Sequence, residues 1–137
     1  MAHFARINAD NIVVQKVVVS NDDITDENGV EQESLGQAFL RKVFNNDDVW
    51  KQTSYNRNFR VNYAGKGMVY DEGRDMFYYP TCQFPNWILN YEDGQWHPPV
   101  PIPDDETEDK RYIWNIEENN WVPLDKTNPL YVAPDDS

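Results

Sequence analysis

The stretch from Lys51 to Lys66, KQTSYNRNFRVNYAGK, combines residue types that bind negatively charged partners. It carries four basic side chains and three aromatic rings but no acid. Such a stretch can bind single-stranded nucleic acid by phosphate contact and base stacking. It can equally dock onto an acidic protein surface, including that of a neighbouring copy. The residues that would make either contact are Lys51, Tyr55, Arg57, Arg60, Tyr63 and Lys66.

The charge of the whole chain separates these two readings. Twenty-four Asp and Glu against twelve Lys and Arg give a formal net charge of −12. A field of that sign repels phosphate polymers and anionic membranes. We therefore expect no nucleic-acid or membrane partner, and we favour docking of the basic stretch onto an acidic protein.

Two tryptophan-containing segments further along the chain repeat each other. WILNYEDGQWHP at 87–98 aligns with YIWNIEENNWVP at 112–123 without a gap, at an offset of 25. In each, a short apolar run, a polar four-residue loop and a Trp that begins the return strand are typical of a β-hairpin. The rings suit either the core of a thin sheet, or contacts between copies, or a platform on which sugar stacks. The tryptophans predicted to pack in this way are Trp87, Trp96, Trp114 and Trp121.

Catalytic and metal-binding patterns are missing from the sequence. His3 and His97 are the only histidines, and neither stands in a spacing typical of a general base or a metal ligand. The acid run DDETED at 104–109 lacks the glycine and the alternating carboxylates of a calcium loop. We expect no catalytic residue, no metal site and no cofactor.

The composition indicates a single domain that binds a protein partner through aromatic side chains on its surface. Its 137 residues include five Trp, eight Tyr and six Phe, while only 39% are hydrophobic. Aromatic rings with a polar group are enriched at protein interfaces. A single cysteine, Cys82, excludes an internal disulfide, and neither a signal peptide nor an apolar run of membrane-spanning length is recognisable. We expect folding in a cytoplasm.

Hydrophobic periodicity predicts the elements that must position these residues. Residues 3–8 and 12–20 form a predicted hairpin, and the apolar run IVVQKVVV suggests that the second strand is central in its sheet. A helix is predicted at 34–44, with a capping box of Ser34 and Gln37. The predicted apolar face of this helix consists of Leu35, Ala38, Phe39 and Val43. Its last turn contains Arg41 and Lys42, whose charges suit the helix dipole.

The rest of the chain is predicted to be β-structure followed by an arm. Strands are expected at 50–55, 57–71 and 76–80, with a turn at 71–75. The prolines of 98–103 favour an extended polyproline II segment that carries the second hairpin away from the first. The sequence therefore predicts an α+β fold, mainly antiparallel, with a compact domain at 1–97 and an extended C-terminal arm at 98–137.

Several stretches together resemble a family. The opening MAHFARINADNIVVQKVVVSND, the middle WKQTSYNRNFRVNYAGKGMVYDEGRDMF, and the closing FPNWILNYEDGQWHPPVPIPDD and YIWNIEENNWV are similar to small virion proteins of tailed phages that infect marine cyanobacteria. The TSYN, NFR, NYAGKG and YD run carries most of the likeness. The resemblance implies a virion structural protein but assigns no role to any residue.

Composition and resemblance lead to one expected function and two alternatives. The first is a capsid decoration, or cement, protein on the outer capsid surface, which binds the major capsid protein and neighbouring copies of itself as an oligomer on the virion. The alternative is a tail or fibre component that recognises host-surface glycans through exposed aromatics. An enzyme acting on cell-wall glycan is a third reading, for which paired acids in so acidic a chain are uninformative.

Overall fold

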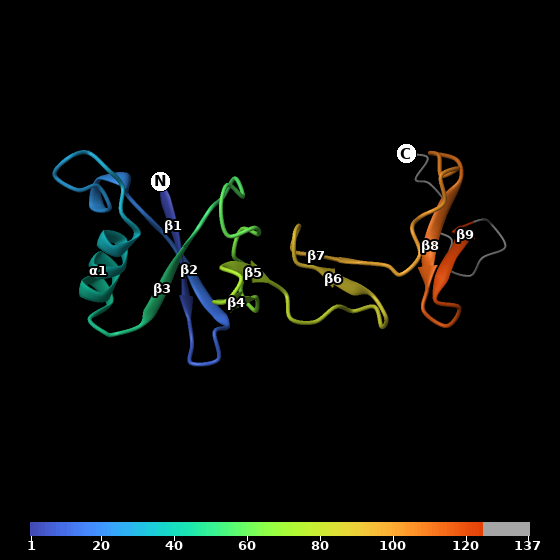
Figure 1. Cartoon of the computed structure of the whole chain (residues 1–137), viewed down its shortest axis with the longest axis horizontal. Helices are drawn as coiled ribbons and strands as arrows, with labels where there is room; N and C mark the ends of the chain where they lie inside the picture. Colours follow the sequence, from blue (N-terminus) through green and yellow to red (C-terminus); the bar gives the residue numbers. More distant parts are fainter. Residues whose placement is uncertain (125–137) are drawn as a thin grey trace, which may run out of the picture. The chain divides into compact units, whose positions relative to one another are not determined.

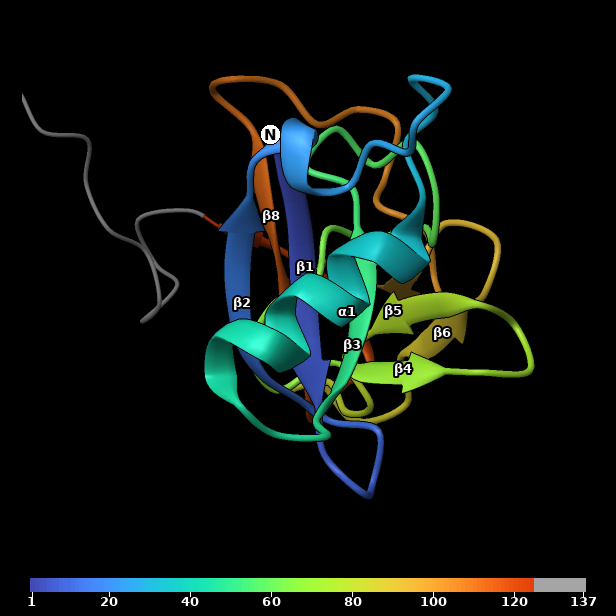
Figure 2. The same cartoon turned by 90° about the vertical axis from the view of Figure 1, so that its left-hand side faces the viewer.

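The computed structural model describes residues 1–124 and has the α+β, mainly antiparallel fold predicted from the sequence. Three strands form the largest sheet: β1 (Ala2–Ile7), β2 (Val13–Val19) and β3 (Val49–Thr53), in the order β2-β1-β3. The predicted N-terminal hairpin is confirmed, and all of its strands pair antiparallel. Figures 1 and 2 show helix α1 crossing one face of this sheet.

The central strand of the sheet is β1, not β2 as its valines suggested. Four of the six residues of β1 are buried, including the consecutive Phe4 and Ala5, whose side chains point to opposite faces, whereas Val18 of β2 is exposed. The valine run reflects a preference for extended backbone more than burial on both faces. At its first residue, β2 also bonds to a segment outside this sheet, because the Val13 N–H donates to the Met68 carbonyl at 2.8 Å.

Helix α1 spans Glu33–Phe44, so the predicted helix at 34–44 is confirmed. The predicted capping box is wrong, because Gln32 is the N-cap and Gln37 instead donates to the Trp50 carbonyl at 2.8 Å. The predicted apolar face is also largely wrong. Gly36 and Leu40 are buried and Phe39 is half-buried, whereas Leu35, Ala38 and Val43 are exposed. A glycine turns inward because β1 lies too close for a larger side chain. A 3-10 turn, η1 (Asn21–Asp23), precedes the helix.

The predicted strand at 57–71 forms only over its last three residues. Arg57, Arg60 and Val61 have positive φ angles of 60°, 55° and 62°, in the left-handed region that side chains rarely adopt. Hydrogen bonds hold this conformation, among them one from the Phe77 N–H to the Arg60 carbonyl at 3.2 Å. The segment before β4 is therefore an irregular loop rather than a strand.

Three hairpins follow one another along the remainder of the chain. Their strands are β4 (Val69–Asp71) with β5 (Met76–Tyr78), β6 (Ile88–Asn90) with β7 (Gln95–His97), and β8 (Arg111–Asn115) with β9 (Asn120–Leu124). The turn predicted at 71–75 and both tryptophan hairpins are thus confirmed. The expected arm continues past Leu124, where residues 125–137 lie outside the described part of the chain.

All three hairpins have the same turn. Each loop contains four residues, and the last of them is left-handed: Asp75, Gly94 and Asn119, with φ of 51°, 70° and 53°. A side-chain oxygen at the end of the incoming strand accepts from the N–H three residues later. The donor–acceptor pairs are Arg74 to Asp71 at 3.0 Å, Asp93 to Asn90 at 3.4 Å, and Glu118 to Asn115 at 2.9 Å.

The first and the third of these hairpins each have a pair of aromatic rings at the same place, one ring on each strand. Tyr70 lies opposite Phe77 with ring centroids 5.1 Å apart, and Trp114 lies opposite Trp121 at 5.4 Å. Phe77 therefore occupies the position that Trp121 holds in the third hairpin. The repeat seen twice in the sequence occurs three times in the structure.

Internal contacts divide the chain into two compact units. The first comprises residues 1–81 and the tip of the second hairpin, 90–95, and the second comprises 82–89 and, within the described residues, 96–124. This division differs from the boundary after residue 97 that the proline run suggested. Ring contacts of Trp87 bring the segment 82–89 into the second unit. Within residues 1–124, no helix is both long enough and apolar enough to cross a membrane.

Candidate functional site

Most of the basic stretch is used inside the first unit. Arg60 binds the carboxylates of Glu33 and Asp75, and its side chain is only 14% exposed. Burial alone lowers the pKa of Arg60, but the hydrogen bonds to the two acids outweigh it and raise the pKa above its ordinary value. Arg60 also donates to the Gln52 carbonyl at 2.9 Å. It is therefore a structural side chain more than a docking one.

Arg60 closes the outer edge of the three-stranded sheet. On the side of β3 away from β1, Glu33 accepts from the Gln52 N–H at 2.6 Å, and Gln37 donates to the Trp50 carbonyl. Together with Arg60, these side chains satisfy backbone groups that would otherwise be open to another strand. The edge of β3 is thus blocked against strand addition.

Of the other basic residues, Lys51 lies near Arg60, because both contact the ring of Tyr70. Arg57 donates to Asn62 Oδ1 at 2.9 Å, and its guanidinium is held beside the tip of the second hairpin. Lys51 is half-buried, with its ammonium 5.2 Å from the centre of the Tyr70 ring. Lys66 is exposed on the loop before β4.

Two aromatic residues of the stretch form a cluster with His3. The rings of Tyr55 and His3 are stacked with centroids 5.8 Å apart, and Tyr63 meets each of them edge-on at 5.3 and 5.4 Å. Lys16 covers Tyr63, with its ammonium 3.6 Å from the ring centre, and donates to the Ala64 carbonyl at 2.9 Å. Tyr55 is nevertheless 66% exposed. The ring of Tyr55 therefore faces solvent, while its contacts with His3 and Tyr63 hold its orientation.

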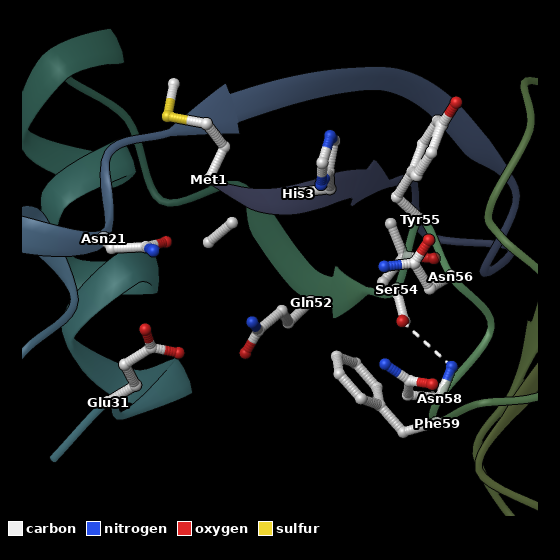
Figure 3. Close-up of a pocket in the computed structure, with 12 residues that line it drawn as sticks. Met1, His3, Asn21, Glu31, Gln52, Ser54, Tyr55, Asn56, Asn58 and Phe59 are labelled. Carbon is white, nitrogen blue, oxygen red and sulfur yellow. Dashed lines mark hydrogen bonds between the residues drawn. The ribbon is translucent and has the colours of Figure 1, made fainter.

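A pocket of about 350 Å³ opens beside this cluster (Figure 3). It lies in the first unit, between β3, the start of β1, the residues that follow β3 and the loop before α1. Four side-chain amides, one carboxylate and two aromatic rings are among the groups that line it. These are Asn21, Gln52, Asn56 and Asn58, then Glu31, and Tyr55 and Phe59.

This pocket, called the amide pocket after the side chains of Asn21, Gln52, Asn56 and Asn58, contains few charged groups. Glu31 is the only acid that lines it, and the lining includes no Lys or Arg. Burial, followed by the positive charges of the N-terminal ammonium and of Lys16, lowers the pKa of His3 below its ordinary value. His3 is therefore mainly neutral near pH 7, and most of the groups that line the pocket are neutral hydrogen-bonding ones, with one acid and the N-terminal ammonium beside them.

Three of the four predicted tryptophans pack on one another in the second unit. Trp87 lies 5.6 Å from Trp114 and 6.5 Å from Trp121 between ring centroids, and Phe84 packs against Trp87 at 4.6 Å. Trp114 is 6% exposed, so it is a core residue of this unit and has no free face for a partner. Trp87, Trp96 and Trp121 are half-buried.

An apolar groove of about 430 Å³ lies against this cluster. Trp121 fixes one wall, because its indole N–H donates to the Val100 carbonyl at 2.8 Å and so holds the proline segment in place. The indole N–H of Trp87 is buried and has no acceptor among residues 1–124. The groove is lined by Trp87, His97, Pro98, Pro101, Ile102 and Trp121.

Neither the amide pocket nor the apolar groove has a set of metal ligands among the described residues. Over residues 1–124, no three His, Cys, Asp or Glu side chains lie close enough together to hold an ion. Comparisons with known protein families, with curated proteins and with solved structures find no match. What the two places can bind is therefore argued from their chemistry alone.

The sequence identified only part of either place. It singled out Tyr55 and the tryptophans as partner-binding, but not the amides or Phe59 of the amide pocket, nor Pro101 and Ile102 of the groove. The amides come from three separate segments of the chain. Only the run of Asn56, Asn58 and Phe59 after β3 gives a local signal, since polar side chains lie between two aromatic ones there.

Proposed function

We propose that this chain is a structural protein of a virus particle, a capsid decoration protein that stabilises the shell by bridging neighbouring subunits. The observation that carries the proposal is the apolar groove of the second unit, with its Trp and Pro walls. The resemblance to small virion proteins of marine cyanophages supports the location. The proposal assigns no catalytic step to the protein.

The groove has the properties of an interface hot spot. Tryptophan is enriched among the residues that dominate binding energy, particularly where a pocket excludes water. Prolines lose little conformational entropy on binding because their backbone is already restricted. The bond between Trp121 and Val100 holds both walls in place before a partner arrives. Such a groove suits an apolar side chain or segment presented by a major capsid protein.

Shell stabilisation would follow from where this surface can bind. A protein that binds the assembled lattice, but not separate subunits, stabilises the lattice by mass action. The net charge of −12 keeps free copies apart by mutual repulsion. Neighbouring copies would then meet only where the capsid positions them.

The first test is the copy number of this chain in purified particles, measured against the major shell protein by quantitative mass spectrometry. A number comparable with that of the shell protein is expected for a decoration protein. A number typical of a tail or a single vertex would contradict the proposal and support the second candidate, a tail or fibre component that recognises host-surface glycans.

A second test addresses the groove itself. Ile102 lines it and is 40% exposed, so Ile102→Ser removes apolar contact without emptying a core. We expect weaker co-sedimentation with shells that lack the protein. Ile88→Ser is the matched control, because Ile88 is 64% exposed and lies outside the groove lining. Equal co-sedimentation of the two variants would show that the groove is not the docking surface.

A further inference from the structure

The amide pocket of the first unit offers a dense set of hydrogen-bonding groups that the protein itself does not use. Among the described residues, the side-chain amides of Asn21, Gln52, Asn56 and Asn58 make no hydrogen bond to another protein group. Each amide can both donate and accept. In Figure 3 these side chains surround the hollow together with Glu31, His3 and Phe59.

This combination matches the hydroxyl groups of a sugar. A hydroxyl donates one hydrogen bond and accepts others, so neighbouring amides and hydroxyls can satisfy each other in pairs. The carboxylate of Glu31 adds a charge-assisted acceptor, which is stronger than a neutral one. The pocket volume of about 350 Å³ lies within the range of about 300–1,000 Å³ in which small ligands bind.

The same lining disfavours charged ligands. Phosphate, sulfate and carboxylate groups are held in proteins mainly by Arg and Lys, and neither lines this pocket. The lining holds one charge of each sign, the Glu31 carboxylate and the N-terminal ammonium of Met1, so either kind of ion would meet a like charge as well as an opposite one. Both considerations select a neutral ligand.

Tyr55 provides the flat apolar surface that a sugar ring also needs. The face of an aromatic ring is partly negative and attracts the weakly positive C–H groups on one side of a pyranose. Tyr55 is 66% exposed, yet His3 and Tyr63 fix its orientation. A ring held in advance loses less entropy when the ligand stacks on it. Phe59, 43% exposed, adds a second aromatic surface to the lining.

We propose that this pocket binds a neutral saccharide, with its hydroxyls on the amides and one ring face on Tyr55. An extended peptide is the less suitable occupant, because Glu33, Gln37 and Arg60 already satisfy the outer edge of β3. The site is separate from the apolar groove and belongs to the other unit. The inference therefore stands whether or not the groove docks onto a shell.

The test is a titration of the full chain, labelled with ¹⁵N, with neutral monosaccharides and disaccharides at millimolar concentrations. The panel contains glucose, galactose, mannose, N-acetylglucosamine and their common disaccharides, with a sulfated sugar as the anionic arm. We expect at least one neutral sugar to shift the side-chain amide signals of Gln52, Asn56 and Asn58. The sulfated sugar is expected to bind more weakly.

Variants then separate the site from a nonspecific effect. Tyr55→Ala is expected to weaken binding roughly tenfold or more, as loss of a stacking ring does elsewhere. Gln52→Ala combined with Asn56→Ala should also weaken it. Gln83→Ala is the control, because Gln83 is an exposed amide of the second unit, and it should bind sugar unchanged.

Three results would overturn the inference. One is that no sugar in the panel shifts the pocket amides while the spectrum shows a folded protein. Another is that Tyr55→Ala and the double variant bind sugar as well as Gln83→Ala does. The third is that the shifts fall on the tryptophans of the second unit, which would place any sugar site there instead. None of these results bears on the copy number that tests the proposed function.

Discussion

The side chain of Asn62 donates a hydrogen bond to the carbonyl of Gly94 at 2.9 Å and so joins the tip of the second hairpin to the loop before β4. Asn62 is only 5% exposed, and its amide is fully paired. Its remaining bonds run to the Phe77 carbonyl at 3.0 Å, and from Arg57 and Gln95, both at 2.9 Å. One amide thus joins the irregular loop, β5 and the loop between β6 and β7.

Asn62→Ala should destabilise the protein by about 2–3 kcal/mol, because it leaves buried carbonyls without a donor. The measurement is the free energy of unfolding from urea denaturation. Asn56→Ala is the matched control, since Asn56 is exposed, and it should change stability by less than about 0.5 kcal/mol. Equal effects of the two substitutions would refute the structural role of Asn62.

Gly94→Ala should cost far more stability than Asn119→Gly, although both change the left-handed residue of a hairpin loop. A Cβ at Gly94 would lie 2.5 Å from Asn62 Nδ2 and 2.8 Å from Val61 Cγ1, and φ is +70°. The left-handed conformation alone costs a residue with a Cβ about 1–2 kcal/mol. Glycine adopts the backbone of Asn119 without strain. Urea denaturation of both variants checks this, and a tolerated Gly94→Ala would contradict the close approach to Asn62.

Gly36→Ala should destabilise the protein, although alanine is favoured over glycine in a helix by about 1 kcal/mol. A Cβ at Gly36 would lie 2.2 Å from Phe4 Cζ and 3.0 Å from Ile24 Cγ2, and Phe4 is fully buried. Overpacking of this kind costs about 1–3 kcal/mol or more. The substitution Phe4→Leu should cost less in the Gly36→Ala background than in the wild type. A double-mutant cycle measured by thermal denaturation tests that coupling, and strictly additive effects would argue against the contact.

Arg60→Met should lower stability by about 1–3 kcal/mol, because Glu33 is left half-buried without its cation and β3 loses a capping donor. Lys66→Met, at an exposed position, should be neutral within about 0.5 kcal/mol. The same pair tests the basic stretch as a docking surface. If Arg60→Met weakened particle binding while leaving the free energy of unfolding unchanged, Arg60 would be a docking residue after all.

Stability should fall as pH rises from about 10 to about 12, in part because of Tyr70. Burial, together with a hydrogen bond to Asp75, raises the pKa of Tyr70 from its ordinary value near 10 to about 12. Between these values the unfolded chain loses the tyrosine proton while the folded chain keeps it, so unfolding becomes more favourable. Tyr70→Phe should make the fall shallower, as measured by urea unfolding at several pH values. An unchanged slope would exclude Tyr70 as a source.

The elements predicted correctly are those specified by neighbouring residues. The N-terminal hairpin, helix α1 and the tryptophan hairpins all follow from local periodicity and turn residues. The loop from Arg57 to Met68 was misread as a strand because its β-type residues outweighed any local sign of left-handed backbone. That backbone is held by distant groups such as the Phe77 N–H. The likeness of the β4–β5 hairpin to the two tryptophan hairpins was not predicted, because it has Phe77 where the other two have tryptophan.

The candidate sites were harder to predict than the fold. Composition indicated that aromatic and basic residues matter, but not that Arg60 would be paired internally with Glu33, 27 positions earlier. Trp114 cannot be told from Trp121 by sequence, although the first is buried and the second lines the groove. The amide pocket depends on η1 and the loop before α1 lying beside β3, which no local pattern encodes.

Because the three hairpins share one turn, the residues of each hairpin are enough to specify its local structure. An Asx acceptor, a four-residue loop that ends in Asp75, Gly94 or Asn119, and an aromatic on the return strand recur with few other constraints. Two of these residues also contact another part of the chain, Gly94 through Asn62 and Asp75 through its ion pair with Arg60. Genetic duplication or loss of a hairpin such as β8–β9 would therefore change the chain in whole steps and leave the three-stranded sheet untouched. Chains of different length could then share the same first unit and differ in how many hairpins follow it.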